Sequence, residues 1–261
     1  VELLDLNEAE RVELEWKYGK ISLPRMALES YYINICKMKT HMQTTVTLGI
    51  KNQKGLLMPS DKKRFHRLGL HEPLARLLEV IRPDLTIVDG VYAMEGQGPV
   101  LGSPVSLNVI IGGEDVVAVD AVAAVTVGVD PEEVETIRIA KMEGLGEGSL
   151  EKITILGERI ENVKRHIKRP ILGLYGRFRN VNIYAGGACI GCLDPLGVIL
   201  EELRIRGILE KLGDLTVIVG RTPHLPERVS DTVLVVGDCA EQYKDLGLFV
   251  PGCPPLVSLS L

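Results

Sequence analysis

The sequence predicts an α/β protein with two parts: a core built on a mixed or mostly parallel sheet, and a smaller C-terminal α/β domain that carries cysteines. Short β-branched runs alternate with stretches of helical periodicity along most of the chain. The strand–helix–strand order of these runs is typical of a parallel sheet. A basic stretch that ends in a proline, residues 164–170, separates two such series. We therefore place the domains at residues 1–168 and 169–261.

The first domain contains a series of expected elements. We expect an irregular or hairpin segment and a loop, four strands, and three helices. The hairpin or irregular segment is at residues 3–18 and the loop at 61–71; the strands are at 31–36, 85–88, 105–111 and 153–156; the helices are at 72–81, 116–127 and 131–142.

The composition is that of a soluble globular protein. The chain has 261 residues, 46% hydrophobic and 25% charged, which is enough for one large or two moderate cores. Its net charge of −5 argues against nucleic acid or an acidic membrane surface as the main partner. No apolar run is long enough to span a membrane, and the N-terminus has no signal-like segment. We expect a cytoplasmic protein, and the sequence does not predict its oligomeric state.

Two features qualify this expectation. Asn and Gln are scarce beside abundant Glu, Lys, Arg, Ile, Leu and Val, which is a thermophile-like composition. Hyperthermophiles keep disulfides inside the cell, so a disulfide interpretation of the cysteines stays open. The chain also begins at Val1 without an initiator methionine, which indicates a fragment or a processed product.

A basic segment follows the first strand of the core. The residues concerned are Lys37, Lys39, His41, Lys51 and Asn52. Cations beside amide and hydroxyl donors suit an anionic group such as a carboxylate or phosphate. A solvated basic loop is the alternative. We take Lys39 and His41 as catalytic candidates, with His41 as an acid/base group, and the other three residues as substrate-binding candidates.

Acidic residues provide the other candidates in this domain. Asp89 and Glu95 lie in a glycine-rich stretch, residues 89–99, which predicts a catalytic or cation-binding loop or simply a tight turn. Glu95 is the third catalytic candidate, and Asp89 a binding candidate. Asp120 lies in an apolar helix, where a buried carboxylate needs a partner. It is either a binding residue or is satisfied by a lysine or a backbone cap.

Four cysteines in the second domain predict one metal site. The expected elements are strands at 181–184, 215–219 and 232–236 and a helix from Asp194-Pro195 to Leu212. Cys189 and Cys239 each follow a strand, and the carboxyl ends of parallel strands meet at one edge. Cys192 is one turn from Cys189, and Cys253 lies in a glycine- and proline-rich loop.

Four thiolates bind a [4Fe–4S] cluster, a [2Fe–2S] cluster or a zinc ion. Only the first cysteine pair is close in sequence, and glycine or proline accompanies the cysteines. This scatter favours a bulky cluster, [4Fe–4S] above all, over zinc, with disulfides or free thiols as further alternatives. Cys36 stands apart and is expected to act as a small hydrophobe.

Several motifs of the first domain resemble one family. They are Lys37-Met38-Lys39-Thr40-His41, residues 47–52 with Gly55, residues 88–90 with 95–99, and residues 118–121. This ordered series resembles the uncharacterised "domain of unknown function 362" family, whose members are often associated with ferredoxin-type iron–sulfur domains. The chain departs from the family by lacking its usual Lys-Pro-Asn segment and the compact ferredoxin cysteine run. The resemblance implies an iron–sulfur context but no particular reaction.

The expected function is that of an iron–sulfur redox protein with an anion-binding site in its first domain. Its partners would be a small anionic molecule or a redox partner protein. No flavin or nicotinamide fingerprint is present. The alternatives are a non-redox enzyme, such as a hydrolase, transferase or lyase, with a structural zinc and a possible Mg²⁺ at its acidic residues, or a protein that delivers metal or clusters.

Overall fold

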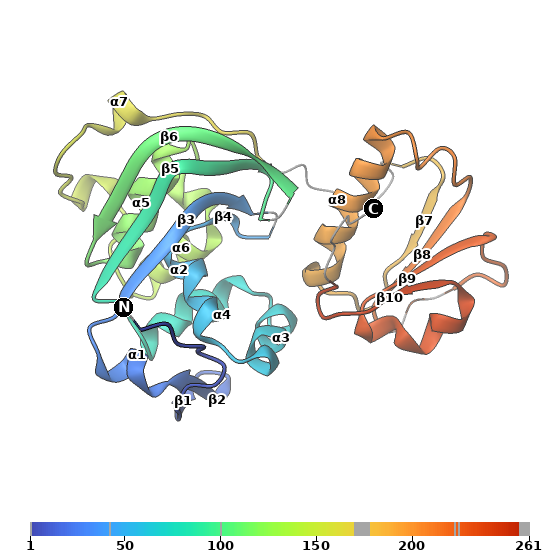
Figure 1. Cartoon of the computed structure of the whole chain (residues 1–261), viewed down its shortest axis with the longest axis horizontal. Helices are drawn as coiled ribbons and strands as arrows, with labels where there is room; N and C mark the ends of the chain where they lie inside the picture. The colour runs from blue at the N-terminus through green and yellow to red at the C-terminus, as the bar shows by residue number, and fades with distance from the viewer. Residues whose placement is uncertain are drawn as a thin grey trace. The chain divides into compact units, whose positions relative to one another are not determined.

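The computed structural model describes residues 2–41, 43–99, 101–169, 178–221, 223 and 225–255. The chain divides into two compact units, Val1–Pro170 and Ile171–Leu261. Each unit combines helices with one main sheet, and the second of these sheets is entirely parallel (Figure 1). The predicted fold class is therefore confirmed. No helix in the described ranges is both long and apolar enough to cross a membrane.

The first unit is built on a four-stranded mixed sheet. Its strand order is β4-β3-β5-β6, with β3 and β5 parallel and the other two pairs antiparallel. The strands are β3 (Ile33–His41), β4 (Thr45–Thr47), β5 (Leu85–Gln97) and β6 (Leu101–Gly113). An antiparallel hairpin of β1 (Arg11–Trp16) and β2 (Gly19–Pro24) precedes it. The predicted hairpin segment and first strand are thus confirmed, with longer strands than expected.

Helices pack on this sheet. They are α1 (Arg25–Glu29), α2 (Gly49–Asn52), α3 (Pro59–Arg67), α4 (His71–Arg76), α5 (Val116–Thr126), α6 (Glu135–Met142) and α7 (Ile160–Val163), with 3₁₀ turns η1 (Gln53–Leu56), η2 (Leu77–Glu79), η3 (Pro131–Glu133) and η4 (Leu150–Lys152). α5 is apolar on nearly every side and is buried beside β5 and β6. In β3, Cys36 and Met38 point into the core while Ile35 and Lys37 are exposed, which is the alternation of a sheet with one covered face.

Three expectations for this unit are wrong. Most of the predicted loop at 61–71 is helix α3, which has Pro59 in its first turn and basic residues in its last, both favourable positions. The predicted loop at 89–99 is largely the second half of β5, paired with β6. Its glycines allow close packing: a Cβ on Gly98 would lie 2.0 Å from the Thr40 carbonyl oxygen. Residues 153–156 do not form a strand.

The second unit is a parallel α/β layer. Its strand order is β10-β9-β8-β7. The strands are β7 (Val181–Tyr184), β8 (Leu215–Val219), β9 (Thr232–Val236) and β10 (Leu248–Val250), joined by α8 (Ile190–Ile205) and the 3₁₀ helix η5 (Asp238–Leu246). Leu196 and Leu200 of α8 pack with Val217 and Val219 of the buried central strand β8. The three predicted strands are confirmed, and β10 was not predicted.

The boundaries of α8 differ from the prediction. The helix begins at Ile190 rather than Asp194 and ends at Ile205 rather than Leu212. Pro195 therefore lies inside the helix, where its missing N–H removes one backbone hydrogen bond. The earlier start brings Cys192 into the first turn and makes Cys189 the N-cap residue.

Candidate functional site

The first unit gathers five basic side chains, which we call the basic cluster. They come from four elements: Lys39 and His41 from β3, Lys51 from α2, Lys54 from η1 and His66 from α3. Burial is the main factor that lowers the pKa of His41, to about 2, and the charges of the other four members lower it further. The five groups therefore lie within electrostatic range of one another.

His41 has a defined tautomer in this setting. Its Nδ1 accepts hydrogen bonds from the backbone N–H groups of Gln43 and Thr44, at 3.0 and 3.3 Å. The ring is buried, with 6% of its surface exposed. Since Nδ1 is an acceptor and the pKa is far below neutrality, the proton of the neutral ring is on Nε2. His41 is thus a hydrogen-bond donor at neutral pH rather than a proton acceptor.

The lysines of the cluster concentrate positive charge. Burial, and then the charge of Lys39, lowers the pKa of Lys51 to about 8. Neither Lys39 nor Lys51 makes a hydrogen bond or ion pair with any residue in the described part of the chain. An uncompensated pair of lysines in a half-buried site is unfavourable without an anion between them.

His66 and Thr47 add buried polar atoms that lack hydrogen-bond partners among the described residues. Lys54 Nζ lies 2.5 Å from His66 Nε2, and burial followed by Lys54 and Lys51 lowers the pKa of His66 to about 4. His66 Nδ1 is buried without a hydrogen-bond partner among the described residues. The same holds for the Thr47 hydroxyl, and Thr47 lies directly opposite Lys39 across the β3–β4 pair. Buried polar groups rarely remain unsatisfied, so these atoms indicate a ligand or water site.

Thr47, Lys54 and His66 were not among the predicted site residues. His66 falls in the predicted loop at 61–71, yet only 7% of it is exposed. The sequence signal that could have identified Lys54 is its spacing of three residues from Lys51, which places both in one turn. His66 had no such signal, because its position depends on α3 folding back onto η1.

The predicted acidic residues lie in other interactions. Asp89 accepts from Lys37 Nζ at 2.7 Å and from the Val91 N–H, and the Lys37 bond is the main cause of a lowered Asp89 pKa. Glu95 accepts from the Lys168 N–H at 2.9 Å. The structure therefore brings Lys39, His41 and Lys51 together, while Lys37 with Asp89 and Glu95 with Lys168 form separate pairs.

Asn52 and Asp120 make hydrogen bonds that position the segment carrying Lys51. Asn52 Nδ2 donates to Asn34 Oδ1 at 2.8 Å. Asp120 is fully buried and accepts from the N–H groups of Gly49 and Ile50 at 2.7 and 2.9 Å. Burial raises the pKa of Asp120 to about 7 against the effect of these two bonds. The predicted backbone cap is thus confirmed: Asp120 caps the first turn of α2, the helix that carries Lys51.

The second unit brings its cysteines together at the carboxyl ends of the strands. Cys189 follows β7 and caps α8, and its thiolate accepts hydrogen bonds from the Cys192 thiol and from the backbone N–H groups of Gly191 and Cys192. The Cys192 bond is the main cause that lowers the pKa of Cys189 to about 6. A helix N-terminus stabilises such a thiolate.

Cys192 is the centre of this group, which we call the cysteine site. Its thiol is buried, and the hydrogen bond to Cys189 raises its pKa, as do burial and the charges of Cys189, Cys253 and Cys239. A Cβ on Gly237 would lie only 2.8 Å from Cys192 Sγ, so the loop after β9 passes directly over this sulfur. All four cysteines predicted to share one site therefore lie within electrostatic range.

Backbone bonds hold the loops of Cys239 and Cys253 together. Gly237 N–H donates to the Val250 carbonyl at 2.8 Å, and Asp238 N–H donates to the Gly252 carbonyl at 3.0 Å. In return, Gly252 N–H donates to Asp238 Oδ1 at 2.5 Å. The two loops thus form one scaffold at the ends of β9 and β10.

The spacing of the four sulfurs bears on the kind of metal that the cysteine site could hold. Among the residues that the structure describes, no three Cys, His, Asp or Glu side chains form a group that could hold a metal ion. No disulfide joins any of the five cysteines. Tetrahedral zinc requires its sulfurs at roughly 3.8 Å from one another, given Zn–S bonds of about 2.3 Å.

Comparisons with known proteins bear on the first unit. Residues 1–125 match the family described as Domain of unknown function (DUF362). A thylakoid-associated protein of Synechocystis sp. is 31% identical over 162 residues, which is 59% of this chain and 50% of that protein. The chain therefore spans about half the length of this curated relative. No solved structure matches the chain.

The family match covers the elements that build the basic cluster. Residues 1–125 include β3, α2, α3 and the segment around Asp120, and thus the motifs on which the resemblance was based. The resemblance is confirmed: residues 1–125 match the model of the uncharacterised DUF362 family.

Proposed function

We propose that this protein is a redox protein that holds a [4Fe–4S] cluster on Cys189, Cys192, Cys239 and Cys253 and binds a small anionic molecule at the basic cluster. The observation that carries the first half is the convergence of the four thiols around Cys192. When bound, the cluster would supply one-electron transfer. The chain itself contributes the thiolate ligands and the amides that surround them.

The donor set fits an iron–sulfur cluster. Thiolates are the usual ligands of such clusters, and Cys189 is already stabilised as a thiolate at the start of α8. Gly237 leaves room directly beside Cys192 Sγ. In a cluster each thiolate binds a different iron, so the sulfurs stand farther apart than around one zinc ion.

Zinc is the second candidate because Cys189 and Cys192 are hydrogen bonded to one another, as a close ligand pair would be. If the bound metal is a structural zinc, the protein is instead a non-redox enzyme whose chemistry takes place at the basic cluster. Either metal requires reduced thiols, so we place the protein in a reducing compartment such as the cytoplasm.

The anion site rests on uncompensated charge. Lys39 and Lys51 have no acidic partner among the described residues, and His41 presents a neutral Nε2–H donor beside them. The free Thr47 hydroxyl and His66 Nδ1 complete a set of donors without acceptors. A carboxylate or phosphate would satisfy several of them with charge-assisted bonds.

The test begins with protein purified without oxygen. We expect about four iron and four sulfide per chain, with a visible absorption that bleaches on reduction. One zinc without sulfide would overturn the cluster and favour the zinc enzyme. In a separate titration, inorganic phosphate should shift the NMR signals of the His41 and His66 rings; unchanged signals at saturating phosphate would contradict the anion site.

A further inference from the structure

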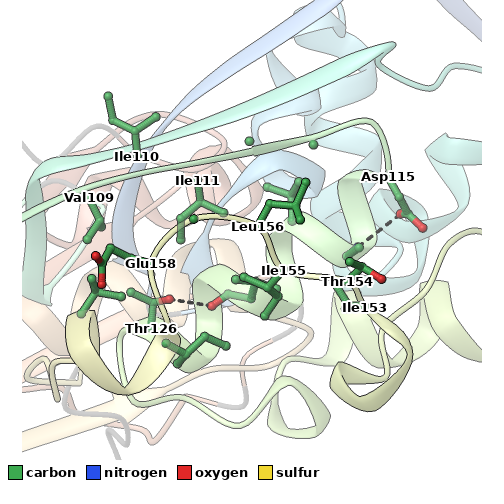
Figure 2. Close-up of a pocket in the computed structure, with 18 of the residues that line it drawn as sticks. Val109, Ile110, Ile111, Asp115, Thr126, Ile153, Thr154, Ile155, Leu156 and Glu158 are labelled. Atoms are coloured by element: carbon green, nitrogen blue, oxygen red, sulfur yellow. Dashed lines mark hydrogen bonds between the residues drawn. The ribbon is translucent and has the colours of Figure 1, made fainter.

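A groove runs along β6 in the first unit, far from the basic cluster in sequence. It is a cavity of about 850 Å³ between β6, α5 and the segment 152–163 (Figure 2). We call it the β6 groove. Neither the family match nor the proposed function assigns any role to it.

One wall of the groove is an open sheet edge. β6 is the last strand in the order β4-β3-β5-β6. Residues 109–113 pair regularly with β5, and the register shifts next to Asn108, which has a φ of +55°. Within the described chain, the backbone groups on the outer side of residues 109–113 have no recorded hydrogen-bond partner. Such an edge is a template for a further strand.

The opposite wall is an extended segment with a free backbone. Residues 153–156 have the composition of a strand, yet they belong to no sheet, and residues 154–156 make no backbone hydrogen bond within the described part of the chain. Figure 2 shows this segment running alongside β6, with Ile111 and Leu156 between the two. A peptide inserted here would therefore find backbone partners on both sides.

The side chains that line the groove indicate the composition of the peptide that it would bind. Ile110 and Leu156 are exposed apolar residues, at 68% and 89%. The charged lining residues are four acids and one base: Glu114, Asp115, Glu147, Glu158 and Lys152. Glu114 is exposed, and Lys152 is paired with Glu147. The groove thus combines apolar walls with a net negative charge.

We propose that the β6 groove binds an extended basic peptide segment of a partner protein as an added β-strand. Main-chain hydrogen bonds to residues 109–113 would provide affinity. Alternate apolar side chains of the peptide, on the face of Ile111, would cover Leu156, and Lys or Arg at the other positions would supply the charge that complements the acids. Five residues extend over roughly 17 Å, which sets the length of the recognised core.

The test uses a fluorescein-labelled peptide, acetyl-Thr-Lys-Val-Lys-Val-Lys-Val-Thr-amide, and the full chain. Fluorescence anisotropy should show saturable binding, and hydrogen exchange should slow at residues 109–113. Two control peptides are the same sequence with Glu in place of Lys and the same sequence with alternate amides N-methylated. Both should bind about tenfold more weakly or worse.

Matched variants of the protein localise the binding. Leu156→Lys should weaken binding about tenfold, because it places a positive charge against the apolar side chains and lysines of the peptide. Leu3→Lys, at a residue that is 97% exposed outside the groove, should have no effect. Equal binding of the Glu peptide, insensitivity to N-methylation, or no binding at saturating peptide would overturn the proposal. A dimer that Leu156→Lys converts to monomer would also overturn it, in favour of a second copy as occupant.

Discussion

The basic cluster and the cysteine site are assembled in opposite ways. The five members of the basic cluster lie between residues 39 and 66, in one short stretch of the chain. The cysteines lie between residues 189 and 253, in segments that follow three different strands of a parallel sheet. The first site collects positive charge, with no acidic partner for Lys39 or Lys51 among the described residues. In the second site the Cys189 thiolate accepts hydrogen bonds from the Cys192 thiol and from backbone N–H groups. The comparison suggests that the first depends on charge balance and the second on the integrity of a whole sheet edge.

Removal of one thiol should have the largest effect. Cys192→Ser takes away the central ligand of the proposed cluster, and we expect iron to fall from about four per chain to nearly none. Cys36→Ala is the matched control, because Cys36 is buried in the other unit and should leave the iron content unchanged. Iron and sulfide analysis measures both. Full iron in the Cys192 variant would show that the four cysteines do not act together.

Lowering the pH should reduce the free energy of unfolding of the first unit, because the fold keeps His41 unprotonated. Its pKa is about 2 in the fold and about 6.5 when unfolded, so between these values the unfolded chain binds more protons. Stability is therefore present above pH 6.5 and lost as the pH falls, by about 1.4 kcal/mol per pH unit. His41→Asn keeps an acceptor for the two backbone N–H groups but does not titrate.

The free energy of unfolding of both proteins is measured by urea denaturation at pH 6.5 and at pH 4. Wild type should lose about 3 kcal/mol more than His41→Asn over this interval. His66, with a lowered pKa, and Asp120, with a raised one that acts in the opposite direction, are present in both proteins and largely cancel. Parallel pH profiles would mean that His41 is protonated in the fold.

A side chain added at the cysteine site should lower the free energy of unfolding by a smaller amount. Gly237→Ala adds a Cβ 2.8 Å from Cys192 Sγ at a φ of +84°, whereas Gly213→Ala has a φ of +64° and nothing within 4 Å. Both positive φ values disfavour a Cβ, and Gly237, with a ψ of 152°, lies in a region that is open essentially only to glycine. We expect Gly237→Ala to lower the free energy of unfolding by about 1–3 kcal/mol more than the control, since the packed sulfur must move. Equal losses would place the Gly237 loop away from Cys192.

The smallest expected effect is on phosphate binding, and it distinguishes Lys51 of the basic cluster from Lys37, which is paired with Asp89. Lys51→Met should weaken the binding of inorganic phosphate about tenfold, which is about 1.4 kcal/mol. Lys37→Met should change it by less than about twofold, because Lys37 is paired with Asp89. Isothermal titration calorimetry at low salt compares them. A larger loss in the Lys37 variant would mean that the anion binds along the exposed face of β3.

The parts of this molecule that sequence could predict are those with a strong local signal. The β-branched runs at 215–219 and 232–236 predict buried parallel strands, and the positions of Cys189 and Cys239 after strands predict their shared edge. Asp120 predicts a partner because it interrupts an apolar helix. In each case one residue and its neighbours decide the outcome.

The parts that could not be predicted depend on long-range contacts. α3 buries little more than Phe65 and His66, so its polar sequence is indistinguishable from a loop. The glycines at 90–98 look like those of a turn, whereas Gly90 packs closely against Val109 and Gly98, just after β5, packs against the Thr40 backbone. The place of His66 beside Lys54 depends on how α3 packs, which no local pattern encodes.

The position of Cys253 has a consequence for the order of events during synthesis. Cys189 and Cys192 leave the ribosome with α8, but their site also needs the loop after β10, which is made later than β7, β8 and β9. A nascent chain translated as far as β9 therefore exposes reactive thiols on an unfinished sheet. Loading of a cluster by the cell should be post-translational, and a transient thiol-protecting partner would be needed only during that interval.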